Sequence, residues 1–488
     1  MNGRSGSAPT IVLFRRDLRV GDNAALAAAV DLGSVLALYI HDEENENIRP
    51  MGAASRWWLH HSLDALGQKL QASGARLIFT RGRTRDVVAR AIAASGAKRV
   101  HWNRRYEPAE AAVDAALKTD LREAGLIAQS FDGALLHEPS LLKTGSGGYY
   151  KVYTPFWRAL NGGVDRRDPI DAPRSIKGWN GKFDGLSLDD LDLLPKKPDW
   201  AGGLACRWTP GEDGARQRLQ AFEKDDLPDY ERQRDIPALQ GTSRLSPHLA
   251  FGEVTPFQIF AALHQSDQAG AAKFRKEIAW REFSYHLLFH NRDLRERSFR
   301  PEFEGFLWRH DARALDAWQD GRTGYPIVDA GMRELWQTGW MHNRVRMIAA
   351  SFLIKDLMLD WRDGETWFWD TLVDADPANN PASWQWVAGS GADAAPYFRI
   401  FNPVLQGEKF DPHGDYVRRY VPEIAALPDR YLHRPWDAPK SLLEENQIEL
   451  GRGYPKPIVD HGAARDRALA AYHSVRGKAD TNENREPS

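Results

Sequence analysis

A segment toward the C-terminal end of the chain gathers residue types that could surround a polar ring system. It starts with Asp374-Ala375-Asp376-Pro377-Ala378-Asn379-Asn380 and continues into Ser383-Trp384-Gln385-Trp386. Two acids at i and i+2, adjacent amides and two indoles would be costly to bury without partners. Carboxylates and amides suit Mg²⁺ or Ca²⁺, but the acids here are few and the indoles many. The composition therefore favours a nitrogen-rich planar cofactor flanked by rings, and we predict no metal site.

Two other stretches place polar side chains on one face of a helix. In the run from 274 to 289, the positions i, i+3, i+4 and i+7 are held by Glu277, Trp280, Arg281 and Ser284. In the run from 341 to 357, the same positions are held by Asn343, Arg346, Met347 and Ala350. A solvated ion pair is the simpler reading of Glu277 with Arg281 alone, and a structural salt bridge is the simpler reading of Arg346. Two such faces in one chain predict a shared polar cavity.

The run Thr242-Ser243-Arg244-Leu245-Ser246-Pro247 directly precedes a helical stretch. We expect Ser246 to be the N-cap residue and Pro247 to take the first helical position. Hydroxyls, backbone N–H groups and the positive end of a helix dipole converge in such a turn, so a pyrophosphate fits there. Taken alone, the stretch is explained more simply as a capped helix.

The elements that must position these residues fall into two classes. Between residues 10 and about 129, short β-branched runs alternate with amphipathic helical stretches. We predict strands at Ile11–Phe14, Val35–Ile40, Arg76–Thr80, Arg99–Trp102 and Ile127–Ser130, and helices at about 22–31, 53–73, 84–95 and 107–124. Strands separated by helices predict a parallel sheet with right-handed crossovers. No G-x-G-x-x-G follows the first strand, so an ordinary dinucleotide-binding turn has little support.

The remaining chain is divided by its composition. We predict an α/β domain over 1–131, then a connector with short helices over 132–205, which is rich in Gly, Pro, Asp and Lys. Helical periodicity dominates afterwards, which predicts an all-α domain over 206–475. Residues 476–488 are polar and charged and are predicted to be a disordered tail.

Composition excludes several classes of protein. The 488 residues include 65 Lys plus Arg and 67 Asp plus Glu, which gives a net charge of −2. The chain is therefore not a polycation, although a local basic face could still bind DNA. Apolar runs such as 35–40 are far shorter than the ~20 residues that a bilayer requires, and residues 1–9 resemble no secretory signal. The single cysteine, Cys206, excludes an internal disulfide. We expect a soluble cytoplasmic protein without membrane contact.

Five motifs in order give the chain a specific resemblance. They are TSRLS (242–246), WREF (280–283), GYPIVDA (324–330), GWMHNR (339–344) and DAAPYFRIFNP (393–403). From about Thr10 to about Glu423 the chain resembles the photolyase/cryptochrome family. The resemblance implies a Rossmann-like α/β antenna domain followed by a helical domain that binds one FAD in a folded conformation.

The resemblance also assigns FAD-binding residues. Those implied to hold the phosphate and ribitol region are Tyr230, Thr242, Ser243, Arg244, Leu245 and Ser246. Those implied to contact the rest of FAD are Trp280, Arg281, Asn343, Arg346, Asp374, Asp376 and Asn380. Asp374 would pair with Arg346, and Asp376 would accept from the ring imide. Asn380 would face flavin N5, where an amide can bond the reduced ring without adding negative charge.

The tryptophans Trp384, Trp361 and Trp308 match the family's electron relay, which carries electrons from the surface to photoexcited oxidised flavin. Indole is easily oxidised, so a chain of indoles is a plausible conductor. The spacing in sequence does not reveal such a chain. With 18 Trp in the sequence, core packing is the alternative for each of the three.

Within the family, this sequence is most similar to the dimer photolyases of bacteria. The lesion pocket is implied to comprise Glu277, Trp280, Asn343, Met347 and Trp386, and DNA phosphates would be held by Arg234, Arg344 and Arg399. The implied activity is a carbon–carbon lyase reaction. In it, excited FADH⁻ donates an electron to a cyclobutane pyrimidine dimer flipped out of UV-damaged DNA, the ring opens, and the electron returns. We expect the protein to be a monomer.

The antenna chromophore and the branch of the family leave alternatives. Glu107, in the pterin-contacting element Tyr106-Glu107, implies 5,10-methenyltetrahydrofolate as antenna. Glu296 stands where folate-binding bacterial relatives carry lysine, so a deazaflavin, another chromophore or an empty site stay open. The rival function is a cryptochrome-type blue-light photoreceptor with the same FAD and relay. Asn380, Trp386 and an end of the chain soon after residue 470 favour repair.

Overall fold

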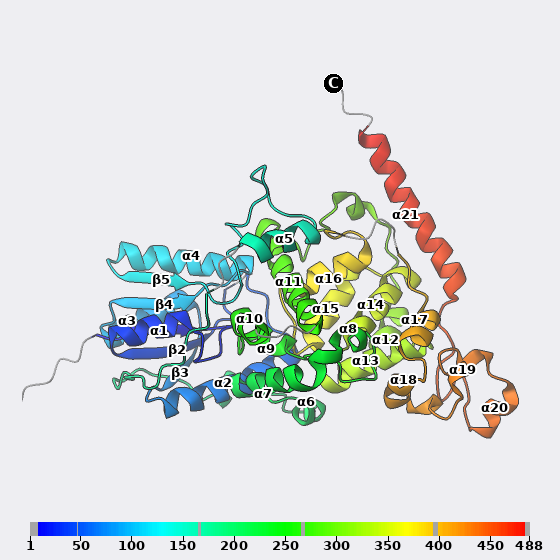
Figure 1. The fold of residues 1–488 in the computed structure, drawn as a ribbon, viewed down its shortest axis with the longest axis horizontal. Helices are drawn as coiled ribbons and strands as arrows, with labels where there is room; N and C mark the ends of the chain where they lie inside the picture. The colour runs from blue at the N-terminus through cyan, green and yellow to red at the C-terminus, as the bar shows by residue number, and fades with distance from the viewer. Residues whose placement is uncertain (1–7, 46, 164–166, 265–268, 394–398, 484–488) are drawn as a thin grey trace, which may run out of the picture. The chain divides into compact units, whose positions relative to one another are not determined.

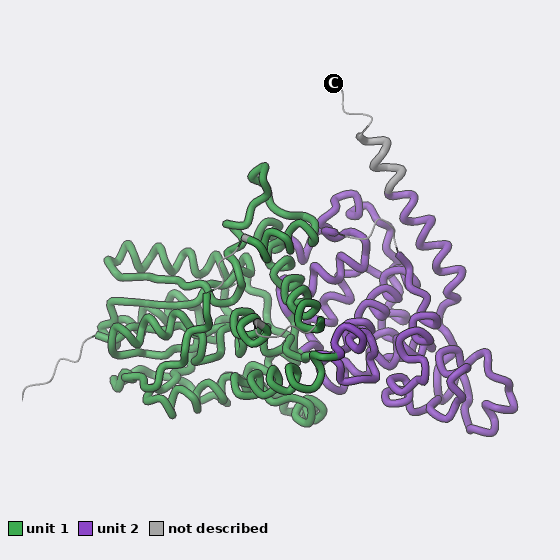
Figure 2. The backbone as a smooth tube through the Cα atoms, in the orientation of Figure 1, with its two compact units in different colours: residues 1–228, 243–292, 373–375 green, residues 229–242, 293–372, 376–488 purple. Residues whose placement is uncertain are grey.

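The computed structural model describes residues 8–45, 47–163, 167–264, 269–393 and 399–483 (Figure 1). The chain forms two compact units (Figure 2). Unit 1 comprises residues 1–228, 243–292 and 373–375, and unit 2 comprises residues 229–242, 293–372 and 376–488. The boundary predicted between residues 205 and 206 follows the class of secondary structure rather than these units, and it stays a prediction. Among the described helices, none has the length and apolar character to cross a bilayer.

A parallel sheet forms the N-terminal part of unit 1. Its strands within the described residues are β1 (Thr10–Phe14), β2 (Val35–His41), β3 (Leu77–Arg81), β4 (Arg99–Asn103) and β5 (Ile127–Phe131). They are ordered β3-β2-β1-β4-β5, and every pair is parallel. The prediction of a parallel α/β sheet is confirmed. The chain order reverses between β1 and β4, which is where the carboxyl ends of such strands leave a crevice for ligands.

Four helices connect the strands: α1 (Ala24–Leu32), α2 (Ala53–Ala72), α3 (Thr84–Ser95) and α4 (Pro108–Glu123). Their ends follow local sequence signals. Asn23 caps α1 by accepting from the Leu26 N–H, and α3 ends at Gly96 with φ +68°. One face of the sheet is covered by α3 and α4, through Val87, Val88, Ala91, Leu117 and Leu121, which pack against inward residues of the strands.

Unit 1 also has helices outside the sheet. It contains α5 (Tyr153–Gly163), α6 (Gly202–Arg207), α7 (Glu212–Ala221), α9 (Ser246–Ala250), α10 (Pro256–His264) and α11 (Ala269–His290). Buried Arg19, directly after β1, connects these parts, because its guanidinium donates to the carbonyl oxygens of Asp22, Gly133 and Gly252 at 2.8–3.1 Å. The segment after β5 and the turn after α9 are thereby joined to the sheet.

Unit 2 is built from helices, and among the described residues after 206 there is no strand. Its helices are α8 (Tyr230–Gln233), α12 (Ala312–Gln319), α13 (Pro326–Thr338), α14 (Asn343–Ser351), α15 (Trp361–Thr371), α16 (Asn379–Ala388), α17 (Pro403–Phe410), α18 (Asp415–Tyr420), α19 (Asp429–Leu432), α20 (Lys440–Glu445) and α21 (His461–Glu483). The all-α prediction is confirmed. A π-helical turn, η5 (Phe352–Asp356), follows α14, so the helix predicted over 341–357 is regular only as far as Ser351.

The predicted disordered tail needs correction. Helix α21 continues to Glu483, so the backbone of residues 476–483 is helical, and residues 484–488 lie outside the described residues. The helix is anchored earlier, where Ala468, Tyr472 and Val475 join a buried cluster with Phe303 and Phe306. Once a helix is nucleated, each further residue adds a hydrogen bond at low entropic cost, so polar residues can extend an anchored helix.

Candidate functional site

The turn before α9 has a backbone shape suited to an anion. Arg244 has φ +51°, which is uncommon for a residue other than glycine, and Leu245 follows with φ −85° and ψ −4°. A left-handed residue beside a right-handed one directs successive N–H groups into one concavity, which is a common anion site. The capping prediction is wrong by one residue, because Leu245 is the N-cap and Ser246 begins α9. Ends of helices shift by a residue or two more readily than their centres.

Buried polar contacts of unit 1 hold this turn. Nε of Arg218, in α7, donates to the Ser243 carbonyl oxygen at 2.7 Å. Beneath α9, the fully buried Glu253 accepts from Nε1 of Trp58 at 2.9 Å and contacts Nδ1 of His248 at 2.5 Å. Because His248 lies in α9 itself, the carboxylate fixes the helix to α2. The turn is therefore a supported structure within unit 1.

Helix α11 carries the first of the two predicted polar faces. Glu277, Trp280 and Arg281 are half-buried along it, and Ser284 is buried. Glu277 lies 4.0 Å from Lys273, and the solvated pair of Glu277 with Arg281 stays a prediction. Nη1 of Arg281 donates to the Ala134 carbonyl oxygen at 3.0 Å. Arg281 thus ties α11 to the segment after β5, and its role toward FAD stays a prediction.

Helix α14 of unit 2 carries the second face. His342 is its N-cap, and Nδ1 of the ring accepts from the Arg344 N–H at 3.2 Å. Burial lowers the pKa of His342 to about 4, so the imidazole is neutral and can accept. Asn343 is exposed at the first position of the helix, and Arg346 and Met347 are half-buried. The predicted face therefore exists, with its most polar residue open to solvent.

Several predicted residues of unit 2 meet around Asp235. Nη2 of Arg344 lies 3.0 Å from the Asp235 carboxylate, and Nε of Arg234 lies 3.8 Å from it. The Arg234 guanidinium lies 5.5 Å from the centre of the buried Tyr230 ring. Nη1 of Arg344 lies 3.9 Å from Sδ of Met347. Two predicted phosphate contacts thus share one carboxylate and lie next to a predicted lesion residue and a predicted FAD residue.

The acidic and amide segment is ordered by its own hydrogen bonds. Oδ1 of Asp376 accepts from the N–H groups of Ala378 and Asn379 at 2.9 and 2.7 Å and from the Asn379 side chain at 2.8 Å. Nδ2 of Asn380 donates to Oε1 of Glu365 at 2.8 Å and to the Glu365 carbonyl oxygen at 3.0 Å. These acceptors occupy both N–H groups of the amide, so Asn380 presents an acceptor oxygen on its other side.

Two of the three tryptophans assigned to the relay are buried and the third is half-buried, and their role in electron transfer stays a prediction. Trp361 and Trp384 are 0% and 2% exposed, whereas Trp308 is half-buried. Trp384 packs tightly, since a Cβ at Gly364 would lie 2.1 Å from its ring. The rings of Phe368 and Trp318 lie near it, with centres 5.0 and 6.2 Å from the Trp384 ring. Trp308 lies 4.3 Å from Phe306, beside the buried cluster under α21.

The remaining predicted residues differ in burial. Trp386 is half-buried in α16, and Arg399 is exposed with its guanidinium 5.0 Å from the Phe401 ring. Residues 394–398 of the DAAPYFRIFNP motif lie outside the described residues. Asp374 is buried and belongs to unit 1, whereas Arg346 belongs to unit 2, so their pairing stays a prediction.

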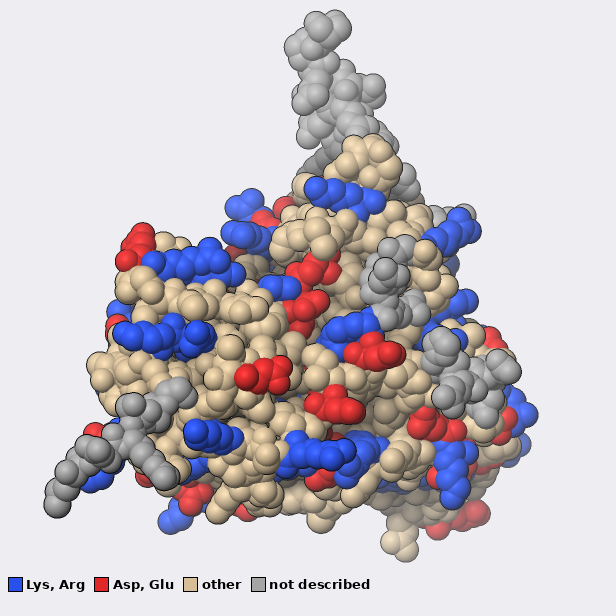
Figure 3. Space-filling view, turned by 60° about the vertical axis from the view of Figure 1, so that its left-hand side comes forward, with Lys and Arg blue, Asp and Glu red and all other residues tan. Residues whose placement is uncertain are grey.

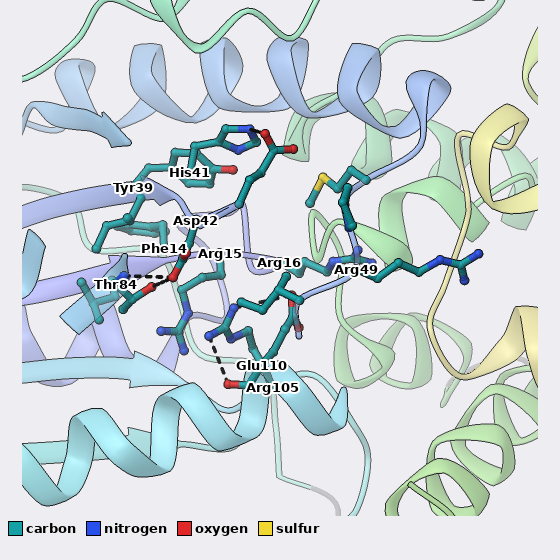
Figure 4. Close-up of a pocket in the computed structure, with 16 residues that line it drawn as sticks. Phe14, Arg15, Arg16, Tyr39, His41, Asp42, Arg49, Thr84, Arg105 and Glu110 are labelled. Atoms are coloured by element: carbon teal, nitrogen blue, oxygen red, sulfur yellow. Dashed lines mark hydrogen bonds and ion pairs between the residues drawn. The ribbon is translucent and has the colours of Figure 1, made fainter. Parts of the chain in front are cut away.

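A pocket opens at the carboxyl ends of β1 and β2 in unit 1 (Figure 4). It holds about 700 Å³, part of it open solvent, and is lined by Phe14, Arg15, Arg16, Tyr39, His41, Asp42, Arg49, Thr84, Arg105 and Glu110 among others. Asp42 accepts from the backbone N–H and hydroxyl of Thr84 at 2.9 and 2.6 Å. Burial lowers the pKa of Arg15 despite Asp114, which lies 3.0 Å away. Aromatic walls with cations and acceptors suit a polar aromatic ligand.

The residues that bear on the antenna prediction have other contacts. Glu107 does not line this pocket; it caps α4, accepting from the Glu110 N–H at 2.8 Å. Tyr106 is buried and donates to Glu138 at 2.7 Å. Glu296 is exposed in unit 2 and pairs with Arg295 at 2.9 Å.

Sequence reasoning missed residues that support the site through long-range contacts. Glu365 orients Asn380, Asp235 joins Arg234 to Arg344, and Trp318 is a ring neighbour of Trp384. The only local signal belonged to Asp235, which directly follows a predicted arginine. Nothing near Glu365 or Trp318 in the sequence marks its partner.

Comparison with known proteins gives consistent matches over almost the whole chain. Residues 10–174 match the family model described as DNA photolyase, and residues 274–474 match the FAD binding domain of DNA photolyase. The chain is 54% identical over 475 residues to deoxyribodipyrimidine photo-lyase of Agrobacterium fabrum, covering 96% of this chain and 98% of that one. It is 38% identical over 483 residues to Cryptochrome-1 of Arabidopsis thaliana, covering 96% and 70%. A bacterial class III photolyase from Agrobacterium tumefaciens superimposes with TM-score 0.94 at 54% identity, covering 98% and 100%.

Proposed function

Since the chain belongs to the DNA photolyase family, we propose that it is a light-driven lyase that repairs cyclobutane pyrimidine dimers in DNA, of the class III type. The observation that carries the proposal is the Asn380–Glu365 pair, because it offers a neutral acceptor where the family places flavin N5. When bound, reduced FAD supplies the excited electron that opens the dimer and recovers it afterwards. The chain's own residues would bind and orient FAD and the DNA lesion, and would exclude water from them.

The residues present fit FAD at both of its ends. The concave backbone at Arg244 and Leu245, held by Arg218, would bind phosphate through N–H groups. Thr242, Ser243 and Ser246 would add hydroxyl groups. Asp376 is held by three donors of its own segment, so its carboxylate would meet the ring imide in a fixed orientation. Asp374, Arg346 and Trp280 are proposed ring contacts.

The neutrality of Asn380 matters for the charge on the flavin. An aspartate in its place would repel the anionic reduced ring when ionised, and when protonated it could supply the ring with a proton. An amide whose N–H groups are held by Glu365 cannot rotate to present a donor without losing two hydrogen bonds. Asn380 therefore favours an enzyme that works from fully reduced anionic FAD.

Lesion binding is proposed to use residues of three helices, which are Glu277 and Trp280 of α11, Asn343 and Met347 of α14, and Trp386 of α16. Trp280 on α11 and Trp386 on α16 offer flat apolar walls, and Glu277 offers a carboxylate to the exocyclic groups of the dimer. Phosphates near the lesion would contact Arg234, Arg344 and Arg399, which position the strand without reading its sequence. Basic side chains are interspersed with acidic ones on the face in Figure 3, so binding would depend on local arginines and weaken with salt.

Light harvesting and recharging would use other residues. We propose that the pocket at the ends of β1 and β2 binds the antenna chromophore, because it lies beside the point where the strand order reverses. A folate, 5,10-methenyltetrahydrofolate, is the proposed ligand, with a deazaflavin as alternative. Extraction of the purified protein and mass spectrometry of the released chromophore decides between them. Trp384, Trp361 and Trp308 are proposed to carry electrons that regenerate reduced FAD.

The proposed enzyme is a cytoplasmic monomer. Its cysteine, Cys206, is exposed and free, which suits a reducing compartment. Fractionation of the host cells and light scattering of the purified protein test the two statements separately.

The function is tested by illuminating the purified, flavin-bound protein with an oligonucleotide that holds one thymine dimer. Repair returns two undamaged thymines in the light and none in the dark. A photoreceptor that only signals would leave the dimer intact, and that outcome would favour the relationship to the cryptochromes over the proposal.

A further inference from the structure

Helix α5, which begins in the connector after the sheet, packs along α11 within unit 1 (Figure 1). Its buried residues Tyr153, Phe156 and Leu160 fall at i, i+3 and i+7, which places them on one helical face. Phe156 packs against Phe283 of α11, with 5.1 Å between the ring centres. This stripe fixes the register of α5 on α11 and brings its first residue, Tyr153, to Trp280.

The Tyr153 and Trp280 rings are stacked in parallel. Their centres are 3.7 Å apart and the angle between their planes is 4°. Phe283 contacts both rings edge-on, at 6.0 Å from Tyr153 and 5.9 Å from Trp280. A separation of 3.7 Å leaves no room for a base between the rings, so one face of Trp280 is closed to any ligand.

The tyrosine hydroxyl is also held. It donates to the Lys276 carbonyl oxygen at 2.7 Å, which in a regular helix is the acceptor for the N–H of Trp280. Burial and the Glu277 carboxylate raise the pKa of Tyr153, which keeps the hydroxyl protonated and able to donate. Tyr153 therefore contacts both the indole and the backbone turn from which the indole projects.

We infer that Tyr153 is a positioning residue for lesion recognition, which holds Trp280 so that only its opposite face is offered to an extruded pyrimidine dimer. This inference rests on the proposed function. A free indole would lose rotamer freedom on binding, whereas an indole already stacked on Tyr153 loses little. The tyrosine increases affinity for the lesion without touching it, and affinity for undamaged DNA does not depend on it.

The test compares Kd for an oligonucleotide with one thymine dimer and for the same oligonucleotide undamaged. Tyr153→Leu keeps an apolar side chain but removes the flat ring, and we expect about 3- to 10-fold weaker binding of dimer DNA alone. Tyr153→Phe keeps the stack and should stay within about twofold of wild type. The repair rate at saturating DNA should be unchanged in both variants, because the chemistry does not involve Tyr153.

Two further variants separate positioning from general packing. In a Trp280→Ala background, Tyr153→Leu should cause no further loss of affinity, because its effect passes through the indole. Phe156→Leu, which loosens the contact of α5 with α11 away from Trp280, should lower Tm but leave the ratio of the two Kd values unchanged. Flavin absorbance and Tm confirm that each variant is folded.

The inference and the proposed function fail in different ways. If Trp280→Ala weakens dimer binding and Tyr153→Leu does not, Tyr153 is only a core residue and the inference is wrong. If Tyr153→Leu and Phe156→Leu change the ratio of Kd values equally, packing explains the effect and the inference is again wrong. If wild type does not distinguish dimer DNA from undamaged DNA, or Trp280→Ala has no effect, the lesion wall itself is wrong and the inference falls with it.

Discussion

Asn380 directs its amide nitrogen at Glu365, 2.8 Å from the carboxylate and 3.0 Å from the backbone carbonyl of the same residue. Both side chains are buried, at 8% and 2% exposure. Asn380→Asp would set two carboxylates against each other in this enclosed position. We expect a loss of about 3 kcal/mol in the free energy of unfolding, measured by denaturant titration.

A reciprocal exchange separates this stability effect from the chemistry. Glu365→Gln combined with Asn380→Asp restores an amide facing a carboxylate, so most of the lost stability should return. The carboxylate would now lie on the flavin side, and repair by the pre-reduced protein should stay impaired. If the double variant regained full repair, the neutrality of Asn380 would not matter as proposed.

Trp384→Phe should block light-driven reduction of oxidised FAD while leaving dimer repair nearly intact after reduction with dithionite. Repair takes its electron from reduced flavin, so the tryptophans are needed only for recharging. Absorbance of the flavin under illumination measures this. Trp318→Phe is the matched control, since Trp318 is a buried ring neighbour of Trp384 that lies outside the proposed relay. Photoreduction at the normal rate in Trp384→Phe would show that electrons enter by another route.

The fold was more predictable from sequence than the site. Strand patterns such as Val35–His41 are local, so all five strands were found to within one residue of their observed ends. Asn380 could be singled out by its type, but the residue that orients it lies fifteen positions earlier in another helix. Tyr153 fell in a segment that looked like a connector, although its spacing with Phe156 and Leu160 is helical. Core residues recur with the period of their helix or strand and can be recognised in the sequence, whereas contacts between residues far apart in the sequence produce no such period.

Trp386→Ala tests whether this half-buried indole recognises the lesion or fills the core. If Trp386 is a wall of the lesion pocket, its removal should weaken binding to dimer DNA by ~1–3 kcal/mol. Tm and the affinity for undamaged DNA should change little. If Trp386 is instead a core residue, its removal should leave a cavity that lowers the free energy of unfolding by ~3–5 kcal/mol. We expect the first result; equal weakening toward both DNAs with a large drop in Tm would identify packing instead.

Lys355 should make stability depend on pH. It is 3% exposed in η5, and burial lowers its pKa from 10.5 to about 7 although Asp356 opposes the shift. Between pH 7 and 10 the unfolded chain keeps a proton that the folded chain has released, so stability rises with pH, by at most about 1.4 kcal/mol per unit.

Lys355→Met should remove this slope. The free energy of unfolding of the variant minus that of wild type should therefore be greatest near pH 7 and decline toward pH 10. Urea titrations at several pH values measure the difference. Lys440→Met, at a side chain 89% exposed, is the control and should follow the wild-type slope. Parallel curves for wild type and Lys355→Met would contradict the prediction.

If light and reduced flavin together split the dimer, repair should leave no net redox change. The most direct measurement illuminates the anaerobic, dithionite-reduced protein with thymine-dimer oligonucleotide and records thymine and flavin absorbance together. We expect thymine absorbance to return only in the light, over many turnovers, while the reduced flavin spectrum is the same before and after. Dimers that persist under illumination although the DNA is bound, or a flavin that is oxidised once for each dimer split, would contradict it.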